Sequence, residues 1–307
     1  MPGTAIPANF ARAMREVYGE EGRRWIDGLP ALLDGLAAHW ALTLEPAFPL
    51  TYNYVAPAIR ADGTPAVLKV GYPDPELPAE FAAVAHFAGH GGARLLAADQ
   101  LRGAMLLERL LPGAPLSTMA EADDAQATRI AARLIVRSWH TPPVGHAFPA
   151  IADWGQGFLR LRQEFDGGAG PFPGALVDEA ESTFAELEST QGAPVLLHGD
   201  FHHGNILDAG AGDWRLIDPK GLVGEPAYEP GTFLQNPRRL FREPTPGLGA
   251  LLGRRLDIFA EELVLDRERI RRWAFAQSIL SAWWSYEDHR AGWEPAMKAA
   301  ELLGELR

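Results

Sequence analysis

The sequence predicts an α+β fold with two lobes, a small β-rich lobe with leading helices over residues 1–110 and a larger, mostly helical lobe over residues 111–307. Three observations support this prediction. The chain has 307 residues, which is more than a single hydrophobic core usually covers. Strand and hairpin signals gather before residue 110, and helical patterns dominate beyond the turn-rich segment at residues 111–115.

The N-terminal lobe is expected to combine helix with antiparallel strands. Apolar residues recur at helical spacing through its first part, and Asp62-Gly63 between two apolar runs is a strong hairpin signal. An Ala-rich segment that ends at paired glycines indicates a further helix. The expected elements are a helical region over residues 9–45, strands at 54–59 and 66–70, a helix over 80–87 and two short strands within 93–110.

The C-terminal lobe is expected to be helical around one irregular segment. Helical patterns run through residue 140, over 151–165 and 175–190, and from 248 to the end. In the irregular segment an apolar triplet precedes His198, and the glycines at positions 199 and 204 disfavour a helix, so the polar residues belong to a loop. Residues 206–207 and 214–217 should then form a hairpin.

Composition and charge exclude several function classes. The chain has 28 Lys and Arg against 40 Asp and Glu, so the formal net charge is −12, and binding to nucleic acid or to an anionic membrane is not expected. A cationic ligand would be attracted. The absence of Cys excludes disulfides and zinc–thiolate sites and favours a reducing compartment. No leader pattern or bilayer-spanning apolar stretch is evident, so we expect a cytoplasmic protein.

Three polar residues of the irregular segment are candidates for the chemistry. Asp200 and Asn205 are five positions apart, the spacing at which protein-kinase catalytic loops place an Asp near the substrate hydroxyl and an Asn on magnesium. The predicted hairpin should return Asp218 to the same place. Carboxylate and amide oxygens would then converge, and such hard ligands suit Mg²⁺ better than Zn²⁺.

The segments HGDFHHGNIL at residues 198–207 and IDPKGLVGEPAYE at 217–229 resemble the aminoglycoside and hydroxyurea phosphotransferases of antibiotic resistance, most closely the streptomycin 6-kinase type. The resemblance implies a two-lobed protein-kinase-like fold, with ATP as the phosphoryl donor and Mg²⁺ as the cofactor. It further implies that Asp200 accepts the substrate proton and that Asn205 and Asp218 hold the metal. His198 is expected to support the loop.

The resemblance extends to a phosphate-binding lysine in the N-terminal lobe. AVLKV at residues 66–70 is similar to the family's strand that carries this lysine, which implies that Lys69 holds the α- and β-phosphates. Glu80 is the expected carboxylate partner and Glu76 the competing one. Lysine is rare in a chain that otherwise uses arginine, which favours a role for the compact ammonium of Lys69.

The remaining nucleotide contacts are also implied by the resemblance. AMLLERLLPG at residues 104–113 is similar to the family's hinge, so the backbone near Glu108 and Leu110 should hold the adenine. The segment PLTYNYV, which contains Thr51 and Asn53, takes the place of the loop over the phosphates, although it carries no glycine.

The acceptor is expected on the helical lobe, which carries a formal charge of 19 − 28 = −9, against 9 − 12 = −3 for residues 1–110. The expected function is ATP-dependent transfer to a hydroxyl of an aminoglycoside or of hydroxyurea, which confers resistance. The alternatives are a housekeeping kinase for choline, homoserine or an amino sugar, and an inactive nucleotide-binding module. The sequence leaves the oligomeric state open. Possible acceptor contacts are Lys220, Glu229, Trp284, Glu287 and Asp288.

Overall fold

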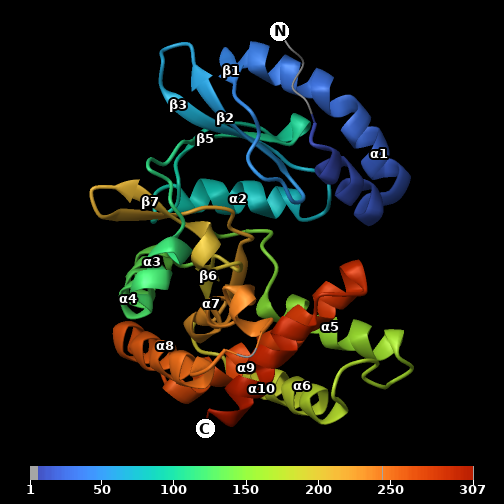
Figure 1. The fold of residues 1–307 in the computed structure, drawn as a ribbon, viewed down its shortest axis with the longest axis vertical. Helices are drawn as coiled ribbons and strands as arrows, with labels where there is room; N and C mark the ends of the chain where they lie inside the picture. The colour runs from blue at the N-terminus through green and yellow to red at the C-terminus, as the bar shows by residue number, and fades with distance from the viewer. Residues whose placement is uncertain (1–5, 244, 307) are drawn as a thin grey trace. The chain divides into compact units, whose positions relative to one another are not determined.

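The computed structural model describes residues 6–243 and 245–306. The chain divides into two compact units, Met1–Leu111 and Pro112–Arg307. The first unit is built on an antiparallel sheet, and the second is mostly helical (Figure 1). The predicted α+β class is therefore confirmed. The boundary expected between residues 110 and 111 lies one residue from the division in the structure.

The sheet of the first unit contains the predicted hairpin. Its strands are β1 (Leu42–Leu44), β2 (Tyr54–Arg60), β3 (Pro65–Val70), β4 (Leu95–Asp99) and β5 (Ala104–Glu108). The strand order is β1-β2-β3-β5-β4, and all the pairs are antiparallel. In the β2–β3 pair, Ala58 lies opposite Ala66 and Val55 lies opposite Lys69. The strand order places Lys69 on the central strand, one residue before that strand ends.

Two helices cover the two faces of this sheet, α1 (Ala8–His39) and α2 (Leu77–Phe87) (Figure 1). Successive residues of a strand point to opposite faces. Leu68 and Val70 accordingly pack in one core with apolar residues of α1, whereas Lys69 points toward α2, where it pairs with Glu80. The order of residues along β3 thus brings a charged side chain to the α2 face.

The ends of the two helices differ from the sequence expectation. The helical region was expected to reach residue 45, but α1 ends at His39, Ala41 has a left-handed φ of 52°, and Leu42 begins β1 with a side chain buried against Ala58. Helix α2 was expected to begin at residue 80 and begins at Leu77, because a proline is tolerated in the first turn of a helix.

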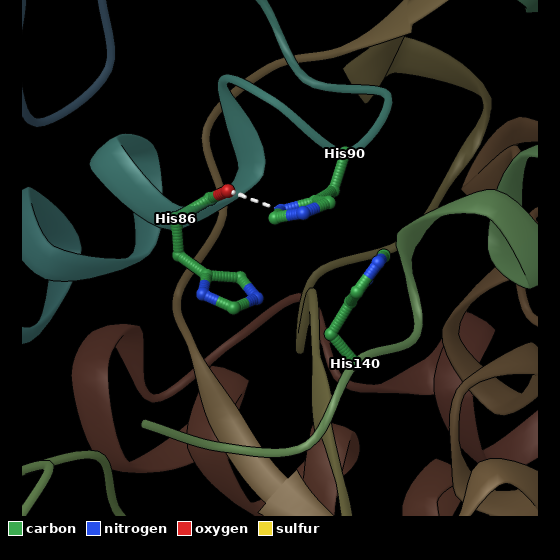
Figure 2. A group of neighbouring side chains, drawn as sticks. All are labelled: His86, His90 and His140. Atoms are coloured by element: carbon green, nitrogen blue, oxygen red, sulfur yellow. Dashed lines mark hydrogen bonds between the residues drawn. The ribbon is translucent and has the colours of Figure 1, made fainter. Parts of the chain in front are cut away.

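A histidine closes the C-terminal end of α2. The His90 ring donates a hydrogen bond from Nδ1 to the main-chain oxygen of His86, at 2.8 Å (Figure 2). The two rings lie with their centroids 5.0 Å apart. This contact satisfies one of the carbonyl groups that a helix end leaves without an intrahelical partner. His140, also drawn in Figure 2, belongs to the second unit.

The second unit is organised around one long buried helix. Its helices are α3 (Leu116–Ala122), α4 (Asp124–Ser138), α5 (Ile151–Glu164), α6 (Gly174–Ser189), α7 (Pro230–Leu234), α8 (Leu248–Leu263), α9 (Arg267–His289) and α10 (Glu294–Glu305). Helix α9 is buried from Trp273 through Trp283 and packs against α5, α6, α7, α8 and α10. A helix that is buried on all sides forms the centre of a core. No helix among the described residues is both long and apolar enough to cross a membrane.

Two small sheets hold the irregular segment of this unit. Strand β6 (Val195–Leu197) pairs with β9 (Leu222–Gly224), and β7 (Ile206–Gly210) pairs with β8 (Asp213–Leu216) as the predicted hairpin. The strand β9 was not predicted. The chain leaves β6, passes through the polar loop, makes the β7–β8 hairpin and returns along β9, so the loop and the residues after the hairpin meet at one end of β6.

Candidate active site

Asp200 and Asn205 are joined within the loop between β6 and β7. The Asn205 side-chain nitrogen donates to the Asp200 main-chain oxygen at 2.9 Å and to the carboxylate Oδ2 at 3.0 Å. Asn205 is buried, whereas the Asp200 side chain is 38% exposed. One carboxylate oxygen is therefore fixed by a buried amide while the group remains accessible.

The chain after the hairpin is fastened to the same loop on both sides of Asp218. The Ile217 N–H donates to the Asn205 main-chain oxygen at 3.0 Å, and the Lys220 N–H donates to the His198 main-chain oxygen at 2.8 Å. Asp218 adopts a left-handed φ of 55°, a conformation that Asp tolerates better than most residues. The structure thus brings the segment of Asp218 to the loop of Asp200 and Asn205.

His198 links the two segments through its ring. The buried imidazole donates from Nε2 to the Ile217 main-chain oxygen at 2.9 Å, and Nδ1 accepts from the Asp200 N–H at 3.3 Å. Burial lowers the pKa of His198 to about 4. The ring is therefore neutral near pH 7, as one donating and one accepting nitrogen require. This geometry is that of a supporting residue.

Glu229 lies beneath the loop and not on an acceptor surface, which corrects its expected place. The residue is 2% exposed, and its carboxylate accepts hydrogen bonds from the main-chain N–H groups of His198, at 2.6 Å, and Gly199, at 3.1 Å. Burial raises the pKa of Glu229 to about 7, and the two N–H donors oppose that rise. The residue fixes the backbone immediately before Asp200.

An aromatic pair packs beside the loop at Gly199. A Cβ atom at this position would lie 3.2 Å from both Lys220 Cβ and Trp154 Cη2, and φ is 82°, so the site requires glycine. Trp154 meets Trp284 edge to face, with centroids 5.4 Å apart. Trp154 was not predicted as a site residue, because on a helix it carries the same apolar signal as a core residue.

The other expected acceptor contacts have different surroundings. Glu287 pairs with Arg160 at 2.8 Å, so part of its charge is already balanced. Asp288 is exposed near the end of α9, and Lys220 is exposed after the hairpin. Trp284 is half-buried against the main core of the second unit. The acidic surface expected from Glu229, Glu287 and Asp288 together is not formed by these three residues.

In the first unit, Lys69 is buried and forms an ion pair with Glu80 of α2. Glu76, the competing partner, is exposed at the N-cap position of that helix. A buried ammonium needs such a partner because desolvation of an isolated charge is costly. The pair fixes the position of the Lys69 side chain on the α2 face of the sheet.

The remaining expected nucleotide contacts lie on β5, shortly after it, and between β1 and β2. The Glu108 carboxylate accepts from the Arg94 N–H and Nε, each at 2.7 Å, and the Glu108 N–H donates to the Arg94 main-chain oxygen at 2.9 Å. Leu110 follows at the end of the unit. Thr51 is exposed and Asn53 is partly buried, in the segment between β1 and β2.

The oxygen donors of the loop fit a hard divalent cation. Asn205 uses its amide nitrogen on Asp200, which directs its oxygen to other partners. Asp218 supplies a carboxylate from the segment fastened beside it. An amide oxygen with a carboxylate is the donor chemistry that Mg²⁺ prefers, and no thiolate exists in the chain.

Comparison with known proteins shows the family to which the chain belongs. Residues 39–289 match the family model described as aminoglycoside/hydroxyurea antibiotic resistance kinase. The chain belongs to this family. A streptomycin 6-kinase from Streptomyces glaucescens is 33% identical over 304 residues, which cover 98% of this chain and 97% of that protein. A hydroxyurea phosphotransferase from Kitasatospora aureofaciens is 32% identical and covers 97% of this chain and 85% of its own length.

A solved structure supports the fold of this kinase. An aminoglycoside phosphotransferase in a ternary complex with ADP and hygromycin B superposes with a TM-score of 0.62, over 89% of this chain and 96% of that one, at 14% identity. The predicted resemblance is confirmed, and the chain is an antibiotic-resistance O-phosphotransferase that acts on a small molecule. The housekeeping and inactive alternatives are not favoured.

Proposed function

We propose that this kinase transfers the γ-phosphoryl group of ATP to a hydroxyl of a streptomycin-type aminoglycoside, with Asp200 as the base. The observation that carries the proposal is the pair of hydrogen bonds from Asn205 to the carboxylate and main chain of Asp200. They hold the carboxylate while leaving it accessible, as a group that must meet a substrate hydroxyl requires.

In this reaction a bond forms between the acceptor oxygen and the γ-phosphorus, and the bond from that phosphorus to the β–γ bridging oxygen breaks. The hydroxyl proton passes to Asp200. Protein groups contribute mainly by positioning in such transfers. Glu229 and His198 supply that positioning, because their hydrogen bonds fix the backbone on both sides of Gly199.

Lys69 would contact the α- and β-phosphates, with its ammonium held by Glu80. The backbone at Glu108 and Leu110 would hold the adenine. Thr51 and Asn53 would cover the phosphates without the glycines that usually form such a loop. The bound ADP in the aminoglycoside phosphotransferase structure supports a nucleotide site of this general kind.

Asn205 and Asp218 would hold Mg²⁺, which neutralises phosphate charge when it is bound. Lys220, two positions beyond Asp218, would offset charge on the transferred group. Because ATP is the donor and the chain lacks Cys, we place the reaction in the cytoplasm.

The acceptor is assigned from the relatives and from charge. Relatives of similar identity are named for streptomycin and for hydroxyurea. The net charge of −9 in residues 111–307 favours streptomycin, which is cationic, as the acceptor. Hydroxyurea is the second candidate. Trp154 beside the loop, and Trp284 in edge-to-face contact with it, would offer apolar contact to a sugar ring.

A phosphotransfer assay against a panel tests the proposal. The panel holds streptomycin, other aminoglycosides, hydroxyurea, choline and homoserine, with ATP and MgCl₂. We expect transfer to streptomycin, and Asp200→Asn should lower turnover by roughly 10² to 10⁴-fold. The control Asp257→Asn makes the same change at an exposed side chain of α8 and should keep the parent's rate. Unchanged turnover in Asp200→Asn would refute the assignment of the base.

A further inference from the structure

Arg255 of α8 is a buried arginine whose guanidinium joins three separate parts of the second unit. It is 1% exposed. Nε and Nη2 donate to the Asp124 carboxylate, at 3.1 and 2.5 Å, and Nη1 donates to the Asn236 main-chain oxygen at 2.7 Å. Nη2 also lies 3.3 Å from Nε2 of His203. The start of α4, the end of α7 and the catalytic loop therefore meet at one side chain.

The contact with His203 has a fixed direction. A guanidinium is always charged and only donates, so Nε2 of His203 must be the acceptor. The imidazole is buried and stacks on Phe233, with centroids 3.7 Å apart and planes 22° apart. Arg255 also lies over the Phe233 ring, 5.3 Å from its centroid. The ring of His203 is thus held on one face and at one edge.

This held ring begins the turn that ends at Asn205. Residues His203–Asn205 form a short 3₁₀ turn, in which the Asn205 N–H donates to the His202 main-chain oxygen at 2.9 Å. Asn205 is the residue that fixes Asp200. A shift of the His203 ring would therefore move the donor that orients the proposed base.

We propose that Arg255 is a positioning residue for phosphoryl transfer, which acts by holding His203 and with it the turn that presents Asn205 to Asp200. This inference rests on the proposed function of the Asp200 loop. A lysine cannot replace the arginine in this role, because one ammonium cannot reach a carboxylate, a carbonyl and a ring nitrogen that lie in three directions.

The first test compares two buried arginines. Arg255→Lys keeps the charge beside Asp124 and loses the fork. The matched control is Arg271→Lys on α9, where the guanidinium donates to Glu268 at 2.7 Å and to the Leu303 main-chain oxygen at 2.5 Å. We expect Arg255→Lys to lower kcat by about 10- to 100-fold with the acceptor KM within about twofold, and Arg271→Lys to keep kcat. Equal kcat values in the two variants would overturn the proposal.

The second test asks whether Arg255 acts through His203. His203→Phe keeps a ring to stack on Phe233 and removes the acceptor nitrogen, so it should lower kcat by a similar factor. The double variant should lose no more than the worse single variant, because both changes break one contact. Losses that multiply would show that the arginine acts by another route. Should Arg255→Lys fail to fold, His203→Phe decides alone, and a parental kcat there overturns the proposal.

The readouts separate this inference from the proposed function. All variants are assayed for transfer to streptomycin and for acceptor-independent release of phosphate from ATP, so a wrong acceptor does not affect the comparison. Unchanged rates in Asp200→Asn would refute the proposed function. A large loss in Asp200→Asn together with parental rates in Arg255→Lys and His203→Phe would refute only the role of Arg255.

Discussion

Replacing Glu229 by Gln should lower turnover. It should also shift the stability of the variant relative to the parent in the variant's favour as the pH rises. The buried carboxylate holds the backbone N–H groups of His198 and Gly199, which precede the proposed base. Glutamine has one acceptor oxygen in place of two and turns an NH₂ group toward a backbone donor. The loop should then lose part of its anchorage, and we expect kcat at pH 8 to fall by about 10- to 100-fold.

The effect on stability follows from the pKa of Glu229. Burial raises this pKa from 4.5 to about 7, so ionising the carboxyl in the folded state costs about 3 kcal/mol at a conversion of about 1.4 kcal/mol per unit. Because the folded pKa is the higher one, the folded state binds the proton more tightly, and stability falls as the pH rises from 4.5 to about 7.

Glutamine does not ionise and avoids this cost. The amide that faces a backbone donor carries a penalty of about 1–3 kcal/mol, but that penalty does not depend on pH. The unfolding free energy of Glu229→Gln relative to that of the parent should therefore rise by about 2–3 kcal/mol between pH 5 and pH 8. For a unit of this size that corresponds to about 4–12 °C in Tm.

Calorimetry at pH 5 and pH 8 measures this difference, and a phosphotransfer assay at pH 8 measures kcat. Glu301→Gln, which removes an exposed carboxylate on α10, is the control for the loss of one charge. A Tm difference for Glu229→Gln that is the same at both pH values would refute the stability argument. Full kcat in that variant would refute the anchoring role.

Three further predictions concern the nucleotide, the metal and the acceptor. Asp218→Asn should weaken nucleotide binding in the presence of Mg²⁺, measured by titration calorimetry with and without the metal, and a magnesium-dependent affinity equal to the parent's would contradict the assignment. Lys69→Arg should lose most activity in a kinetic assay although it keeps the charge, because the position beside Glu80 is buried and suits a compact ammonium; full activity would contradict the phosphate-binding role of Lys69. The KM of the acceptor should rise with added salt more than that of ATP, since exposed charges are screened within about 8–10 Å. A neutral acceptor with salt-independent kinetics would count against an aminoglycoside.

The parts of the fold that the sequence predicted are those determined by neighbouring residues. The β2–β3 hairpin follows from Asp62-Gly63 between apolar runs, and the loop of Asp200 follows from its glycines. Strands β1 and β9 were missed, because each has three residues and forms only by pairing with another strand, β1 with β2 and β9 with β6. Their local patterns are too short to distinguish from helix or loop.

The supporting residues of the site were harder to predict for a related reason. Glu229 lies 31 positions from the N–H of His198 that it binds, and Arg255 lies 52 positions from His203. Each is an ordinary charged residue in the sequence, where charged residues are usually exposed. Only the burial of the side chain and the direction of its hydrogen bonds distinguish these two residues from charged residues on the solvated surface.

Burial differs sharply among the residues of the proposed site. Asp200 is 38% exposed on its side chain, whereas Asn205, His198 and Glu229, which hold it directly or through the backbone, are buried. A carboxylate that must accept a proton from a substrate needs access, and a group that fixes geometry gains strength in a low-dielectric surrounding. Changes at Asp200 should therefore act on the proton transfer itself, while changes at Glu229 should act on the fraction of time for which the loop is correctly placed. A pH profile of kcat distinguishes these cases. Glu229→Gln should remove the pH dependence near pH 7 that comes from ionisation of Glu229, whereas a variant that retains Glu229 should keep it.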